Sequence, residues 1–253
     1  MSAVRAGVWL LPALLVAGAL AAWQLATVVF RLPRWLLPSP LDIAAALVGG
    51  ADLIAVHAAR TLEETLLGLA GAFVAGVAAA VTMDRAPLAR RAFYPVLVVS
   101  QTVPVVAIAP LLVVWFGYDL LPKVIVVALV CFFPVVVATF DGLGSVDEDA
   151  VRLVRAMGAT GWQVFWRVRW PGALPFVFSG LRIGVTYGVI GAIVGEWVGA
   201  STGLGIYMVR AADQLLTERV FASIVVASAL SLVLFRLVGL LEWLMLPWHR
   251  PKR

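Results

Sequence analysis

The chain offers little of the chemistry that an enzyme needs. His57 and His249 have no partner at metal-ligand spacing, and the single cysteine, Cys131, lies in an apolar run and cannot form an internal disulfide. A phosphate-binding loop needs Gly-Lys followed by Ser or Thr, whereas Lys123 and Lys252 each follow a proline. We therefore expect no metal site, no cofactor and no catalytic residue. Any ATP hydrolysis that drives the protein must take place on another chain.

Polar side chains inside the apolar runs favour a different chemistry, the passage of a solute through a membrane. Ser100, Gln101 and Thr102 stand just before Pro104, in a run that contains two further prolines. Proline removes a backbone donor and bends a helix, and freed polar groups are tolerated in a bilayer where they line a water-filled cavity. The triplet predicts part of a solute pathway, although Gln101 could instead serve only to satisfy the kinked backbone.

Glu196 stands close to the end of another apolar run. A charge at the bilayer centre costs roughly 2.5–3.5 kcal/mol on insertion scales, so a carboxylate in a span needs a reason. Glu196 could line an outer gate or pair with Arg210. Hydroxyl groups in the same span are further candidates, but they could bond only to the helix backbone. The predicted pathway residues are Gln101, Thr102, Thr186, Tyr187 and Glu196.

The segment 145–175 is a long polar connection between two apolar runs. Acidic residues at 147–149 favour a helix N-terminus, and Val151, Val154 and Met157 form an apolar ridge at three-residue steps. Such a ridge flanked by charges fits a groove on a soluble partner. The alternative is a connector that merely covers helix ends, but about 30 residues is long for that purpose.

A second short helix is predicted at about 160–170, after a turn at Gly158, where a helix commonly ends in a left-handed residue. An aromatic stripe beside arginines is typical of a helix that lies at a membrane surface. We expect Pro171 and Pro175 to break the chain before the next span. The stripe consists of Trp162, Trp166 and Trp170.

These candidates require helices that cross a membrane. Of the 253 residues, 63% are hydrophobic and 13% are charged, against about a quarter charged in soluble domains. The apolar runs approach the ~20 residues that cross a hydrocarbon core. Small residues every fourth position from Gly68 to Ala80 predict close helix packing, either within the chain or between subunits. The predicted spans are 7–30, 61–83, 93–116, 122–141, 176–199 and 221–243.

The basic residues indicate how the spans are oriented. With the N-terminus inside, about eleven lysines and arginines fall on the cytoplasmic side and about six on the other. Both termini are then cytoplasmic. Because this distribution explains the positive charge, we expect no nucleic-acid partner.

The stretch VDEDAVRLVRAMGATGWQVFWRVRWPGALPFVFSGLRIGV resembles the cytoplasmic loop of bacterial ABC importer permeases. The small residues, Gly-Ala turn and proline of that loop match Ala150, Ala156, Gly158, Ala159 and Pro171. The usual opening of the loop is degenerate here. SGLRIG, GEW at 195–197, PLLVVWFG and FFPVVVAT also resemble the family, from about residue 57 onward. The closest similarity is to the nitrate/sulfonate/taurine-type branch, which includes permeases for thiamine precursors and riboflavin.

The resemblance implies an all-α polytopic protein of the bacterial inner membrane, with the type I importer permease fold. It implies a second permease subunit in a homodimer, two cytoplasmic ATPase subunits docked on the loop and an extracytoplasmic solute-binding protein. The cargo would be a sulfonate-, taurine- or nitrate-like anion or a vitamin-precursor heterocycle, moved by alternating access. The expected divisions are 1–56, an N-terminal helix and external segment; 57–246, the permease domain; and 247–253, a basic tail. The docking residues would be Ala150, Val151, Val154, Ala156, Met157, Gly158, Ala159 and Pro171.

Two other functions stay open at this stage. A carrier driven by an ion gradient needs acids within the membrane, and the spans offer Glu196 and, at a span end, Asp141. A membrane scaffold without transport would need no acidic residue within the membrane. Each differs from the importer in having no ATPase partner.

Overall fold

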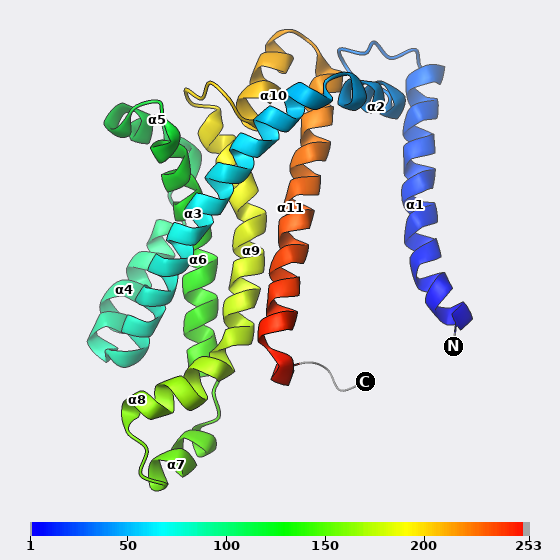
Figure 1. Ribbon diagram of the computed structural model, residues 1–253. Helices are drawn as coiled ribbons and strands as arrows, with labels where there is room; N and C mark the ends of the chain where they lie inside the picture. The colour runs from blue at the N-terminus through cyan, green and yellow to red at the C-terminus, as the bar shows by residue number, and fades with distance from the viewer. Residues whose placement is uncertain (1, 250–253) are drawn as a thin grey trace.

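A computed structural model describes residues 2–249, with side chains from Leu10 onward, and these residues form helices and connecting turns (Figure 1). The predicted basic tail at 247–253 lies mostly outside this range. A π-helical turn occupies Phe165–Arg169 and a short 3₁₀ turn Pro247–His249. The α-helices are α1 (Ser2–Val29), α2 (Pro40–Gly49), α3 (Ala51–Arg85), α4 (Pro87–Ser100), α5 (Val105–Phe116), α6 (Leu120–Gly144), α7 (Glu148–Ala156), α8 (Gly161–Val164), α9 (Trp170–Glu196), α10 (Leu204–Asp213) and α11 (Thr217–Met245).

The helices agree with the six predicted spans, except that the third is broken. Five helical segments are long and apolar enough to cross a membrane, and α4 with α5 makes a sixth if the two form one span. The two helices meet at an angle of 99°. Pro104 occupies the N-cap of α5, and because it lacks an N–H it cannot continue the hydrogen bonds of α4.

The core lies where α6 packs between α3 and α9, beside α11 (Figure 1). Small residues permit the close approach: a Cβ at Gly180 of α9 would lie 2.7 Å from the Pro134 carbonyl oxygen of α6. On α3 the predicted small-residue face, from Gly68 to Ala80, is buried and meets Val127 and Val135 of α6. That face therefore serves packing within the chain.

α1 stands apart from the other spans in Figure 1. It contacts the remainder near its C-terminal end, where the Trp23 ring lies 5.7 Å from the ring of Phe221. There the Gln24 Oε1 atom also accepts a hydrogen bond from the Leu41 amide. Of the residues in the apolar part of α1, only 6% are buried within the chain. α1 thus presents most of its surface to lipid or to another protein.

The short helices gather at opposite ends of the bundle. α2 and α10 lie at one end, and α7 and α8 project from the other (Figure 1). The sequence analysis did not predict α2 or α10. α2 carries a recognisable start, because Ser39 and Asp42 form a capping box and Pro40 occupies the first turn.

Candidate functional site

α7 has no buried residue and carries the apolar ridge predicted for docking. Asp147 caps it by accepting a hydrogen bond from the Asp149 amide, and Arg152 forms an ion pair with Glu148 one turn away. Leu153 is 64% exposed and Met157 78%. The helix is therefore held in shape by its own caps and charges, while its surface remains open to a partner.

The turn after α7 has the left-handed residue that the sequence predicts. Gly158 has a φ of +88°, a conformation that L side chains rarely adopt. Its amide donates to the Arg155 carbonyl, and the Ala159 amide reaches back to the Val154 carbonyl at 3.2 Å. Ala150, Val151, Val154 and Ala159 are half-buried, while Ala156 is exposed. The predicted docking residues thus form one connected surface around α7 and its turn, with Pro171 lying apart on α9.

The expectation that Pro171 and Pro175 break the chain before the span is wrong. The helical backbone runs without interruption from Gly161 to Glu196, through the π-helical turn at Phe165–Arg169. Figure 1 shows the chain changing direction between α8 and α9 without leaving helix. Pro171 follows directly on the π-helical turn, and π turns and prolines are the usual sites of helix kinks.

The tryptophan stripe packs against the end of α3. The Arg85 guanidinium lies 5.0 Å from the ring centroid of Trp162 and 4.4 Å from that of Phe165. Beside it, Arg169 forms an ion pair of 2.7 Å with Asp84 and a longer hydrogen bond to the Leu143 carbonyl on α6. These contacts join the start of α9 to α3 and α6.

The predicted pathway residues lie on different helices and do not form one site within a single chain. Gln101 and Thr102 are exposed at the break between α4 and α5, and the Thr102 hydroxyl donates to the Val99 carbonyl. Thr186 and Tyr187 are exposed on α9, and the Thr186 hydroxyl donates to the Arg182 carbonyl, the backbone alternative noted above. Exposure of Gln101 in a spanning segment is consistent with a pathway that a second protein completes.

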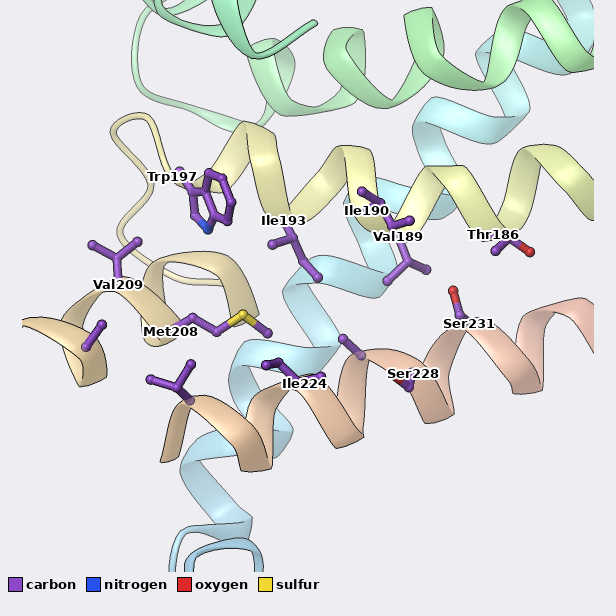
Figure 2. A pocket seen from close by; sticks show the side chains of 13 residues that line it. Thr186, Val189, Ile190, Ile193, Trp197, Met208, Val209, Ile224, Ser228 and Ser231 are labelled. Carbon is purple, nitrogen blue, oxygen red and sulfur yellow. The ribbon is translucent and has the colours of Figure 1, made fainter. Parts of the chain in front are cut away.

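Thr186 also lines a groove of about 690 Å³ between α9, α10 and α11. Figure 2 shows Thr186, Ser228 and Ser231 near one another in this groove, with Trp197 and Met208 further along. The remaining walls are aliphatic. Of the predicted pathway residues, this groove includes Thr186 alone.

Glu196 has partners other than the one expected. It is fully buried, and its carboxylate accepts hydrogen bonds from the Thr61 hydroxyl at 2.6 Å and from the Gly205 amide. Among residues 10–249 the ion pairs include none between Glu196 and Arg210, so the predicted pairing is wrong. Glu196 instead ties the end of α9 to α3 and to the start of α10.

The buried polar cluster around Glu196 includes α3 residues that the sequence analysis missed. The His57 Nδ1 atom accepts a hydrogen bond from the Gly203 amide, and the Thr61 oxygen accepts one from the Leu204 amide. Glu64 is buried and meets Arg60 at 3.3 Å. The available signal was a polar stripe at three- and four-residue spacing, from His57 through Thr61 to Glu64, at the start of an otherwise apolar helix.

Lys123 is a third buried charged residue at the same end, after Glu196 and Glu64. Its ammonium donates to the Tyr118 and Asp119 carbonyls, at 2.7 and 3.1 Å, at the start of α6. With the Glu196 cluster, it supplies hydrogen-bond partners to loop backbone that lies between helices. This end of the bundle is therefore held by buried polar groups, whereas the α7 end is held by arginines at the surface.

Comparison with known proteins agrees with this arrangement. The family model described as binding-protein-dependent transport system inner membrane component matches residues 72–245. The formylaminopyrimidine transport permease protein ThiX of Halalkalibacterium halodurans is 40% identical over 229 residues, covering 90% of this chain and 91% of that protein. The taurine transport system permease protein TauC of Escherichia coli is 31% identical over 193 residues, covering 76% and 70%.

Solved structures share the fold. A structure of the MetNI methionine ABC transporter in inward-facing conformations superposes with a TM-score of 0.63 at 18% identity, over 76% of this chain and 97% of that one. The ion-gradient carrier is not favoured, because the matching family model describes a component of binding-protein-dependent transport systems and the relatives are transport permease proteins. The chain belongs to the family of binding-protein-dependent transport system inner membrane components, and it is a multi-pass permease of the ABC importer type.

Proposed function

We propose that the chain forms half of a solute pathway and that two separate cytoplasmic ATPase subunits drive it through α7. The observation that carries this proposal is the exposed apolar surface of α7 and its turn, at Leu153 and Met157, on a segment that the Arg169–Asp84 ion pair joins to α3. An amphipathic helix of this kind binds in a groove of a partner through residues at helical spacing. ATP hydrolysis on the partner would move α7, and alternating access would follow from the motion of α3, α6 and α9.

The second half of the pathway comes from another copy of the permease. Carriers that alternate access usually need two related halves, and this sequence shows no internal repeat. The exposed Gln101 and Thr102 at the break in the third span support a second copy, because polar groups are stable in a bilayer only where protein or a cavity satisfies them. The detached α1 offers further surface for such a contact.

The orientation follows from the basic residues. Arg85, Arg90, Arg152 and Arg169 lie at the end that carries α7, which makes this the cytoplasmic end by the positive-inside rule. The termini are then cytoplasmic and the membrane is the bacterial inner membrane. α2 and α10 lie on the outer side, where an extracytoplasmic binding protein would deliver the solute.

The cargo is a heterocyclic vitamin precursor. Formylaminopyrimidine is the solute named for ThiX, the relative with 40% identity over 90% of the chain. Taurine is named for TauC, which is 31% identical over a shorter part. The apolar character of the groove beside Thr186 supports a ring compound over a small anion. A sulfonate is the competing cargo.

Reconstitution tests the proposal. The permease, its ATPase and its binding protein are placed in liposomes, and uptake of labelled formylaminopyrimidine and of labelled taurine is measured with and without ATP. We expect ATP-dependent uptake of the heterocycle and at least a tenfold preference over taurine, about 1.4 kcal/mol. Uptake driven by a proton or sodium gradient without the ATPase would reject the importer mechanism. ATP-dependent uptake of taurine in preference would reject only the cargo.

A further inference from the structure

A second groove lies between the cytoplasmic half of α3 and the tryptophan stripe. Its volume is about 580 Å³, within the range of sites that hold a small molecule. One wall is aliphatic and aromatic, with Phe73, Val77 and Val81 of α3. The other consists of the rings of the stripe, including Trp162 and Trp166, both of which are largely exposed. The groove belongs to neither the pathway residues nor the α7 ridge.

A cation stands at the groove without an anionic partner. Arg85 lines it and lies over the rings of Trp162 and Phe165, which attract a cation but do not accept its hydrogen bonds as an anion would. Its guanidinium carries five N–H donors that an anion can use. Among residues 10–249 no carboxylate pairs with Arg85, whereas Arg169 pairs with Asp84 and Arg152 with Glu148. The arginine is therefore placed to bind an anion from outside the chain.

The position of the groove limits what that anion can be. Phe73 to Arg85 is the last part of a membrane span, and tryptophans are enriched where a span meets the headgroups. At this depth in the bilayer the apolar walls of the groove contact lipid acyl chains and not water. A soluble anion would bind Arg85 but would leave the apolar walls unused. A ligand with both a phosphate and an acyl chain uses both parts.

We propose that this groove binds an anionic phospholipid, with the phosphate on Arg85 and an acyl chain between α3 and the tryptophan stripe. The indole N–H groups of Trp162 and Trp166 are available to the headgroup. Arg90 and Arg91, which follow α3 in sequence, add positive charge at the same end and favour an anionic headgroup over a zwitterionic one. The lipid braces α3 against the segment that connects α7 to α9.

Native mass spectrometry of the complete transporter in detergent tests the site, with added phosphatidylglycerol or phosphatidylcholine as the probe. We expect phosphatidylglycerol to be retained at about one molecule per permease chain and phosphatidylcholine to be lost at lower collision energy. Arg85→Gln should lower the retention of phosphatidylglycerol about five-fold, which corresponds to about 1 kcal/mol. Arg34→Gln, at an exposed arginine that pairs with Asp42 of α2 at the opposite end of the bundle, should leave retention unchanged.

A second variant and a competitor separate the lipid from other occupants. Trp166→Ala removes part of the wall and should weaken retention, while inorganic phosphate in large excess should not displace the lipid. Equal retention of the two phospholipids, or equal retention by Arg85→Gln and the parent, would overturn the proposal. Displacement by inorganic phosphate would show that Arg85 binds anions in general and would overturn the assignment of a lipid. A subunit of the assembled complex found inside the groove would also overturn it. None of these outcomes depends on the cargo or on ATP-driven uptake.

Discussion

At the residue scale, Glu196 is a fully buried carboxylate whose hydrogen-bond partners lie on two other helices. Its carboxylate, Thr61 and His57 accept hydrogen bonds from the amides of Gly205, Leu204 and Gly203, three consecutive donors at the N-terminus of α10. A buried amide without a partner costs about 1–3 kcal/mol, so each acceptor has a structural purpose. Glycine is required at 203, because its φ is +133° and a Cβ there would collide with the Glu196 carboxyl group.

We expect Glu196→Ala to lower stability by about 2–4 kcal/mol, because it leaves the Thr61 hydroxyl and the Gly205 amide unsatisfied in a buried site. Glu196→Gln keeps an acceptor and should cost less. Thermal unfolding of the detergent-solubilised protein, followed by size-exclusion chromatography, measures both. Glu63→Ala is the control, since Glu63 lies on α3 near Thr61, is half exposed and pairs with Arg60 at the surface. Equal unfolding temperatures for Glu196→Ala and Glu63→Ala would contradict the structural role of Glu196.

A second residue-scale prediction concerns the ion pair of Arg169 with Asp84. The Asp84 side chain is nearly buried and holds Arg169 at 2.7 Å. Asp84→Ala should reduce ATP-driven uptake more than ATP hydrolysis, because the loop would move without carrying α3 with it. It should also cost about 1–3 kcal/mol of stability, as expected for a hydrogen bond between charged groups. Restoration of uptake by the exchanged pair, Asp84→Arg with Arg169→Asp, would show that the contact itself matters. Equal loss of hydrolysis and uptake in Asp84→Ala would contradict a role of this ion pair in coupling the loop to α3.

At the element scale, α7 depends on the turn that ends it. Val154, Gly158 and Ala159 form a helix end in which only position 158 requires a positive φ. The space around Gly158 is open, so a side chain there meets backbone strain and no clash. Conformation and packing can therefore be separated experimentally at this position.

We predict that Gly158→Val abolishes ATP-driven uptake while the protein still inserts in the membrane. A β-branched residue is strongly disfavoured at positive φ, at a cost of roughly 1–2 kcal/mol, so the turn would change and α7 would leave its position. Gly158→Asn is the matched variant, because asparagine tolerates the left-handed conformation, and it should keep most of the uptake. Membrane fractions probed with antibody verify insertion. Normal stimulation of the ATPase by Gly158→Val would refute the role given to α7.

At the scale of the whole molecule, the sequence predicted the fold closely but not the contacts of the buried polar residues. Span positions followed from hydropathy, since lipid requires every backbone group to be paired inside a helix. The bend near Pro104 and the turn at Gly158 followed from residues with restricted or unusual backbone preferences, whereas the division of the third span into two helices was not predicted. The unbroken helix through Pro171 was missed, because a π-helical turn is a property of the assembled chain and leaves no clear sequence pattern.

The partners of Glu196 could not be predicted from local sequence. Thr61 and Glu196 are 135 positions apart and meet only because α3 crosses α9 at the α10 end of the bundle. The acid was recognised as unusual, but its partner was sought nearby, at Arg210. Similarly, Gln101, Thr186 and Glu196 were grouped by polarity, and the fold distributes them over separate regions of one chain.

That distribution leads to a prediction about the assembly. If two copies enclose the pathway, Gln101 of one copy faces the other across it, since the exposed amide otherwise meets lipid. In a Cys131→Ala background, Gln101→Cys should form a dimer-sized adduct with a short bifunctional thiol reagent in native membranes. Val48→Cys, which is 80% exposed on α2 beyond the spans, is the control and should give far less adduct. Solute and ATP should change the yield at position 101, because alternating access opens and closes the space between the copies. A yield at 101 no higher than at 48 would place the exposed triplet against lipid and leave the pathway to other residues.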